Sequence, residues 1–267
     1  MKRFLQRSLA IILFLGLSVF TGIAAKQFRP LPGFHALFNG KDLTGWHVNP
    51  MKIGHGTGGH WIVEDGAVTG EQDPPGSGNG GILLSDQKFG DYEISLETKT
   101  DWGFDSGLFL RSTQDGKCYQ VMIDYHEKGN VGEIYREGVG LDGATNRTFQ
   151  LDGIYKDADK TILKDIRATR VEKNNKGAGG EPLIDLNRFT KQTWKINTWN
   201  TIRARIQGSP PHITTWVNGR LMSEFTADTK YSDVLLKRGA IGLQVHGGKG
   251  CPKGLKARYR NIQIKEL

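Results

Sequence analysis

The chain has 267 residues, of which 36 are glycine and 24% are charged, and its formal net charge is +8. Three of those positive charges lie in the first 25 residues, so removing that segment would leave 242 residues with a net charge of +5. Such a mild surplus lacks the dense basic patch of a nucleic-acid-binding protein, and we expect no nucleic-acid partner. The remaining length fits one large β domain (26–267), and no linker-like stretch indicates a second.

Residues 1–25 have the pattern of a secretory signal peptide. Basic residues lie within the first seven positions, and the apolar run 9–20 is followed by small residues up to Ala25. A signal anchor is the alternative, but the run is shorter than the ~20 residues that span a bilayer, and no charged stop-transfer pattern follows. We therefore expect cleavage near Ala25, export to the periplasm or the cell exterior, and no stable membrane span afterwards.

Alternation of apolar and polar residues with a period of two dominates the rest of the chain. It recurs in six segments: 92–99, 119–126, 202–207, 212–217, 241–246 and 258–265. Such segments predict half-buried antiparallel strands. Asp65-Gly66 and Asn218-Gly219 lie between short β-rich runs, as type I′ hairpin turns require. The pattern predicts an all-β sandwich or jelly roll.

One long segment, 138–197, departs from this rhythm because it is charged and alternates poorly. Irregular segments of that length within a compact domain are usually functional or disordered. We therefore expect an insertion over one edge or mouth of the sandwich, with a short helix.

Cys118 and Cys251 are the only cysteines. Because an exported chain meets an oxidising compartment, we predict a disulfide between them; two free buried thiols are the alternative. A zinc site would need more ligands than two thiols supply.

Several familiar signatures are absent or incomplete. Residues 54–59 fit G-x-G-x-x-G, but the strand before and the helix after that a dinucleotide site needs are not predicted. No G-x-S-x-G motif occurs, so the sequence gives no sign of a common serine hydrolase.

Polar side chains gather on one face of two predicted strands. Strand parity places Gln120, Asp124 and His126 on one face of the first, and Gln244 and His246 on one face of the second. A Cys118–Cys251 disulfide would make these strands antiparallel neighbours and bring the two rows together. Asp105 and Arg111 could join this face, and Trp216 could provide a stacking platform. The alternative is an ordinary solvated outer face, where polar alternation is expected anyway.

Seven blocks of sequence resemble the 3-keto-disaccharide hydrolase domain family. In chain order they are FNGKDLTGW at 38–46, FGDYE at 89–93, DSGLFLR at 105–111, WNT at 199–201, WVNG at 216–219, GAIGLQVH at 239–246 and YRNI at 259–262. Their order and spacing cover the chain from about Leu37 to Leu267. Asp105 stands where this family usually has asparagine, and 138–197 is longer than the usual connection.

The resemblance implies a concanavalin A-like jelly roll of two curved antiparallel sheets, with the site on the concave sheet. It also implies activity on oxidised glycosides. A ketone at C3 acidifies the hydrogen at C2, so the glycosidic bond can leave by elimination and water can then add. This route needs a base near C2, an acid near the leaving oxygen and a group that stabilises the enolate.

We assign these roles as hypotheses. His126 or His246 would be the base, Asp124 or Glu133 the acid partner or metal ligand, and Arg111, Gln120 and Gln244 would hold the sugar. Asp105 and Trp216 complete the expected binding residues. The sequence identifies no definite cofactor, and a divalent metal ion at the enolate is compatible with these side chains. The expected partner is a small-molecule or glycan substrate.

Two rivals from other classes remain open: a non-catalytic carbohydrate-binding domain and an interaction module of a cell-surface assembly. Catalysis predicts the polar cluster at the bottom of a pocket closed by 138–197. Binding alone predicts an open groove lined by aromatic residues such as Trp61 and Trp216.

Overall fold

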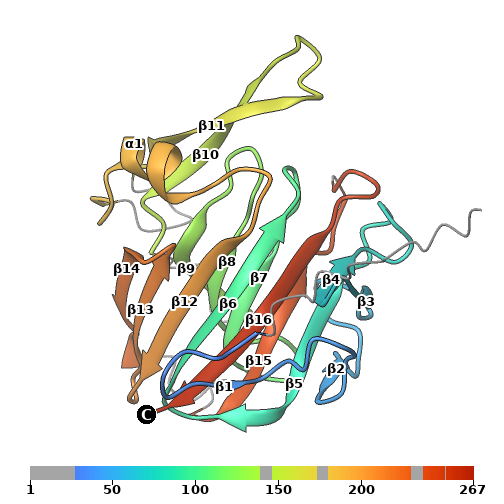
Figure 1. Cartoon of the computed structure of the whole chain (residues 1–267), viewed down its shortest axis with the longest axis vertical. Coiled ribbons are helices and arrows are strands. Elements are labelled where there is room, and N and C mark those ends of the chain that lie inside the picture. Colours follow the sequence, from blue (N-terminus) through green and yellow to red (C-terminus); the bar gives the residue numbers. More distant parts are fainter. Residues whose placement is uncertain (1–27, 139–145, 173–179, 230–236, 250) are drawn as a thin grey trace, which may run out of the picture.

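The computed structural model describes residues 28–138, 146–172, 180–229, 237–249 and 251–267, so the expected signal peptide lies outside it. Two antiparallel sheets pack face to face, and a separate two-stranded hairpin stands at one end of them (Figure 1). This arrangement confirms the predicted all-β jelly-roll sandwich. Among the described residues, no helix is long and apolar enough to cross a membrane.

The larger sheet has eight strands, and its order is β14-β13-β12-β6-β16-β4-β3, with β1 paired to β16. Its strands are β1 (His35–Ala36), β3 (His60–Glu64), β4 (Ala67–Glu71), β6 (Tyr92–Thr100), β12 (Asn200–Gln207), β13 (His212–Val217), β14 (Arg220–Thr226) and β16 (Ala257–Glu266).

The second sheet has six strands in the order β2-β5-β15-β7-β8-β9. They are β2 (Trp46–Val48), β5 (Gly81–Phe89), β7 (Gly107–Ser112), β8 (Cys118–Ile123), β9 (Val131–Glu137) and β15 (Gly239–Val245). The candidate site lies on the face of this six-stranded sheet that is turned away from the core.

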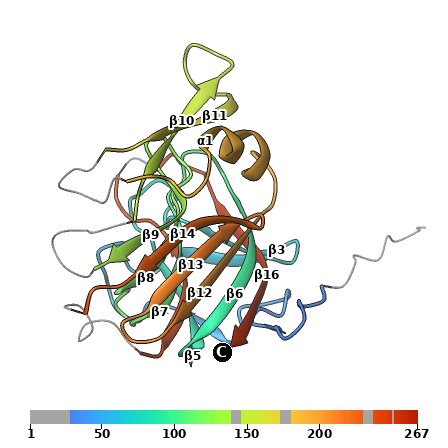
Figure 2. The ribbon, with the colours of Figure 1, turned by 90° about the vertical axis from the view of Figure 1, so that its left-hand side faces the viewer.

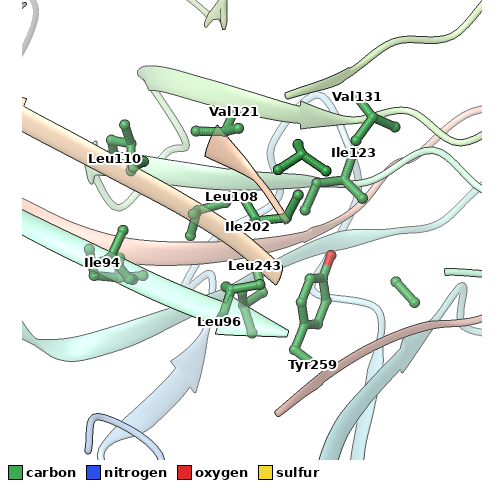
Figure 3. Close-up of a cluster of buried hydrophobic side chains, with 14 of the residues drawn as sticks. Ile94, Leu96, Leu108, Leu110, Val121, Ile123, Val131, Ile202, Leu243 and Tyr259 are labelled. Atoms are coloured by element: carbon green, nitrogen blue, oxygen red, sulfur yellow. The ribbon is translucent and has the colours of Figure 1, made fainter. Parts of the chain in front are cut away.

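Alternate residues of both sheets point inward and form the core (Figure 3). Ile94 and Ile202 of the eight-stranded sheet pack with Leu108, Val121 and Leu243 of the six-stranded sheet, and all five are fully buried. Burying a side chain of this kind stabilises the fold by about 1.5–3 kcal/mol. The side chains at the alternate positions of β7, β8 and β15 therefore point to the outer face.

The two predicted hairpin turns are confirmed. Asp65 and Gly66 join β3 to β4 with φ values of 49° and 75°, and Asn218 and Gly219 join β13 to β14 with 47° and 77°. Positive φ at both central positions is the requirement of a type I′ turn, and it accounts for the Asx-Gly pairs.

Segment 138–197 contains a hairpin of β10 (Phe149–Tyr155) and β11 (Leu163–Arg170), followed by the short helix α1 (Leu186–Arg188) and the π-helical turn η1 (Phe189–Thr193). The hairpin pairs with neither sheet. It rises beyond one end of the sandwich in both orientations (Figures 1 and 2). That end is where the candidate site opens.

The predicted disulfide is wrong, because Cys118 and Cys251 are both free. Strands β8 and β15 are not neighbours: β7 lies between them and is antiparallel to each, so β8 and β15 run parallel. Cys118 begins β8 whereas Cys251 follows the end of β15, which places the two thiols at opposite ends of the sheet. A disulfide needs Cα atoms within about 7 Å.

Candidate functional site

Two adjoining chambers lie over the outer face of the six-stranded sheet. The small chamber has a volume of about 260 Å³ and is lined by His55, Asp105, Gln120, Met122, Asp124, Tyr135, Glu137, Arg147 and His246. The large chamber has a volume of about 830 Å³ and extends under the β10–β11 hairpin. Asp105 and His246 line both chambers, so they mark the boundary between them.

Three strand ends meet at this boundary. Asp105 comes just before β7, His126 just after β8 and His246 just after β15. The backbone N–H of His246 donates to the carbonyl oxygen of Asp105 at 3.2 Å, which joins two of these ends. Asp105 Oδ2 lies 3.4 Å from His126 Nε2 and 3.9 Å from His246 Nε2. One carboxyl group therefore faces two imidazoles.

Asp124 is a second carboxyl group hydrogen-bonded to Asp105. Burial, together with the negative charge of Asp105, raises the pKa of Asp124 well above its usual range. Burial acts on Asp105 as well, but the hydrogen bond to His126 and the nearby histidines outweigh it and lower the pKa of Asp105. These opposite directions favour a proton on Asp124 and a negative charge on Asp105.

The orientation of His126 is fixed by its backbone. Its Nδ1 donates to the carbonyl oxygen of Glu127 at 2.7 Å, so Nε2 faces Asp105. Burial opposes the charged form of His126, yet the hydrogen bond and charge of Asp105 raise its pKa. The imidazolium is thus favoured beside an ionised carboxylate.

The predicted polar rows do meet, although β7 separates their strands. Gln120 Nε2 donates to Gln244 Oε1 at 3.0 Å across Gly107 of β7. A Cβ atom at Gly107 would lie only 2.2 Å from Gln120 Nε2. The absence of a side chain at position 107 is what allows this contact.

His55 extends the same row, and sequence reasoning missed it. Its Nε2 lies 3.1 Å from Gln244 Nε2 and 3.2 Å from Glu137 Oε1, and its ring packs edge-on against His246 with centroids 4.8 Å apart. Because Gln244 Oε1 accepts from Gln120, the Gln244 amide must donate to His55. The histidine lies in the glycine run 54–59, which forms a tight loop.

That loop depends on its glycines. Gly56, Gly58 and Gly59 have φ values of 135°, 139° and 69°, and a Cβ atom on Gly247 would lie 1.9 Å from the carbonyl oxygen of His55. A histidine flanked by such glycines was the available signal in the sequence.

The large chamber has an aromatic wall that sequence reasoning also missed. Trp102 follows β6, and Tyr155 ends β10 on the hairpin. The Trp102 indole N–H donates to Tyr155 Oη at 2.8 Å, and Tyr155 donates to Glu127 Oε1 at 2.7 Å. Trp102 comes from a connecting segment, where periodicity carries no information, and Tyr155 ends a strand within 138–197, where alternation predicted none.

Three predicted site residues lie elsewhere. Arg111, near the other end of β7, donates to the carbonyl oxygens of Gly90 and Gly208 and pairs with Asp91 at 2.5 Å. Trp216 belongs to the eight-stranded sheet, where the Arg203 guanidinium lies 5.4 Å from its ring centroid. Neither residue lines a chamber.

The third is Glu133, which is buried against the segment that leads into β10. It accepts hydrogen bonds from the Thr148 backbone N–H at 2.7 Å and from Asn130 Nδ2 at 2.8 Å, as well as from the Thr148 hydroxyl. Burial raises its pKa to about 7. Trp61, named for an open binding groove, is buried and donates its indole N–H to the Gly58 carbonyl.

Asp105, Asp124 and His126 form the one group among the described residues that could hold a metal ion, with their ligand atoms all within 4.8 Å of one another. Asp124 Oδ1 is buried and has no hydrogen-bond partner. An unsatisfied buried oxygen beside a carboxylate and an imidazole fits the mixed O and N ligation of a divalent ion.

The fold and sequence have recognisable relatives. A crystal structure from Parabacteroides distasonis ATCC 8503, provisionally described as a glycosyl hydrolase, is similar at 20% identity with a TM-score of 0.51; 88% of this chain and 94% of that chain are covered. A carbohydrate-binding module, CBM66 of Bacillus subtilis, is similar at 12% identity with a TM-score of 0.45, covering 83% and 96%. No curated protein matches the chain.

The family comparison covers nearly all of the sequence. Residues 33–265 match the 3-keto-alpha-glucoside-1,2-lyase-like domain. This match confirms the resemblance carried by the seven sequence blocks and supports a domain that acts on glycosides. The chain belongs to the 3-keto-alpha-glucoside-1,2-lyase-like domain family.

Proposed function

We propose that the protein cleaves 3-keto-glycosides by elimination followed by hydration. The observation that carries this proposal is the placement of Asp105 and His246 on the boundary between two chambers. A glycosidic bond that crosses this boundary would put the oxidised ring in the small chamber and the leaving group in the large one.

His246 is the base in this proposal. It lines both chambers, whereas His126 lines only the large one and carries the raised pKa of an imidazolium. Asp105, 3.9 Å from His246 Nε2, stabilises the positive charge that His246 acquires.

The ketone oxygen needs donors where negative charge develops. Asp124 lines the small chamber, and its raised pKa favours the protonated form, which has a hydrogen atom to donate there. In the small chamber, Gln120 and the Arg147 guanidinium, whose buried Nε has no hydrogen-bond partner, are available to sugar hydroxyls.

The proposed reaction balances in protons and electrons and needs no oxidant. His246 removes the C2 proton, and the C–H electrons form the enolate of the C3 ketone. The enolate re-forms the ketone and makes the C1–C2 double bond as the C1–O bond breaks, and His246 returns the proton to the leaving oxygen. Water then adds its oxygen to C1 and a proton to C2, so one water is consumed for each glycosidic bond.

The cluster of two carboxyl groups and one imidazole at this boundary also fits a divalent cation. Asp105, Asp124 and His126 would hold it, and Asp124 and His126 would lose their protons on binding. When bound, such an ion would supply positive charge at the enolate oxygen.

A substrate comparison tests the proposal. The purified protein is incubated with a 3-keto-disaccharide and with the same disaccharide unoxidised, each with and without a chelator. Release of free sugar from the keto substrate alone is expected. Equal release from both substrates would contradict the elimination route, and binding without release would favour the carbohydrate-binding alternative.

We further propose that the mature chain is exported, to the periplasm or the cell exterior. The support is the signal-peptide pattern of residues 1–25. Mass spectrometry of the protein from intact cells is expected to find an N-terminus near residue 26. An intact N-terminus on cytoplasmic protein would contradict this.

A further inference from the structure

The wall of the large chamber is held rigid by a chain of hydrogen bonds between the segment after β6, the end of β10 and the segment after β8. Trp102 donates to Tyr155, and Tyr155 donates to Glu127. Glu127 Oε1 also accepts the backbone N–H of Gly153 at 3.1 Å. The hairpin is thereby tied to the segments that follow β6 and β8.

Packing adds to this rigidity. Trp102 meets Tyr125 edge-on with ring centroids 4.9 Å apart, and Tyr125 meets Trp194 at 5.1 Å. The Tyr155 ring folds back over Gly153, where an added Cβ atom would lie 2.6 Å from Tyr155 Oη. The indole is therefore fixed before any ligand arrives.

The rest of the large chamber matches a ring-shaped ligand. Pro252 and Leu255 add apolar surface, while Lys160 and Thr161 at the end of the hairpin add polar groups. A sugar or aromatic ring likewise combines two kinds of surface. Its flat apolar faces can stack on an indole, and its edges are polar or exposed. The small chamber is lined by several charged groups and by one phenol ring, that of Tyr135, but by no tryptophan.

Resting on the proposed function, we infer that Trp102 and Tyr155 form a leaving-group subsite that selects 3-keto-glycosides whose leaving group carries a ring with an apolar face. Binding of that ring holds C1 at the boundary beside His246. A substrate whose leaving group is too small to reach the wall gains nothing from it.

The test compares three 3-keto-glucosides that differ only in the leaving group: methyl, glucosyl and phenyl. In wild type, kcat/KM is expected to be higher for the two ring-bearing substrates. Trp102→Ala is expected to lower kcat/KM for those two by roughly 3- to 10-fold, mainly through KM, and to change the methyl substrate by less than 2-fold. The substrate whose kcat/KM falls more in Trp102→Ala shows whether the subsite prefers a sugar ring or an aromatic ring.

Three further variants separate recognition from folding. Trp102→Phe keeps an aromatic ring and is expected to recover part of the loss. Tyr155→Phe keeps its ring but loses the bond to Glu127, and should raise KM for ring-bearing substrates only. Trp216→Ala, on the other sheet, is the matched control and should leave all three substrates unchanged.

Two results would overturn the inference, and they differ. If wild type cleaves all three substrates but Trp102→Ala lowers all three equally, Trp102 is structural and the subsite is wrong while the proposed function stands. If wild type cleaves none of the three, the proposed function fails and the subsite assignment fails with it.

Discussion

The two sheets present polar outer faces built in different ways. On the eight-stranded sheet the two carboxylates of β6 that point outward have guanidinium partners: Glu93 lies 2.7 Å from Arg203, and Glu97 lies 2.6 Å from Arg260. Burial alone would raise the pKa of Glu93, but the hydrogen bonds and charges of its arginines lower it. Charge is compensated on this face.

On the six-stranded sheet the charges are not compensated in this way. Asp105 and Asp124 lie against each other, and the pKa of one falls while that of the other rises. Asp124 Oδ1 is left without a partner. Both faces come from the same alternation in sequence, so polarity alone does not identify a site. Two adjacent carboxyl groups whose pKa values shift in opposite directions beside a cavity do.

The largest expected difference between the two faces is catalytic. His246→Asn is expected to lower kcat on a 3-keto-disaccharide by about 10²- to 10⁴-fold, the usual contribution of a positioned base. The matched control is His212→Asn on β13, whose ring bonds only to Thr226 among the described residues. Equal rates for wild type and His246→Asn would remove His246 from the mechanism.

The contact across β7 gives the next effect. Gly107→Ala places a methyl group against the buried Gln120 side chain, and such overpacking costs about 1–3 kcal/mol of unfolding free energy. Denaturant unfolding measures it. Adding Gln120→Ala to this variant should recover stability; if the double variant is less stable than the single one, the clash is not the cause.

The two faces should also differ in the sign of their stability change with pH. Asp124 has a raised pKa, so its ionisation in the unfolded chain makes wild type lose stability as pH rises above the ordinary aspartate value of about 4. Asp124→Asn removes that loss. Its melting temperature at pH 7 is expected to exceed that of wild type by about 2–4 °C, the shift produced by ~1 kcal/mol, and the gap should close toward pH 4.

Glu93→Gln is the counterpart on the eight-stranded sheet. Its lowered pKa contributes stability above the ordinary glutamate value, and that stability is lost as pH falls through the folded pKa. The variant should therefore melt below wild type at pH 7 and approach it in acid. Shifts of the same sign in both variants would contradict the contrast between the faces.

The smallest expected effect concerns the cysteines. Cys118 and Cys251 are free, so a reductant should leave the melting temperature unchanged. A native disulfide typically contributes about 2–4 kcal/mol, so a drop of several degrees in reductant would show that the thiols are joined.

Strands, turns and faces could be predicted because their signals are local. Alternation assigned Gln120, Asp124 and Gln244 to the outer face, and Asx-Gly pairs marked the turns. The order of strands is not local, so the insertion of β7 between β8 and β15 was missed, and with it the parallel relation that separates Cys118 from Cys251.

Residues outside the predicted strands were harder still. Trp102 reaches the site from a connecting segment, where no periodicity assigns a side chain to a face, and Tyr155 ends a strand that alternation did not predict. Arg111 is polar in sequence but is used to bind backbone carbonyls. A polar residue type in a strand does not reveal whether the fold or a ligand uses it.

The central claim is that the C1–O bond breaks by elimination through proton removal at C2. The most direct measurement is to run the reaction in deuterated water and locate deuterium in the released 3-keto sugar by NMR. The proposal predicts one deuterium at C2 from the hydration step, acquired during turnover and lost with His246→Asn. A product without deuterium at C2 would contradict it, because direct hydrolysis leaves the C2 hydrogen in place.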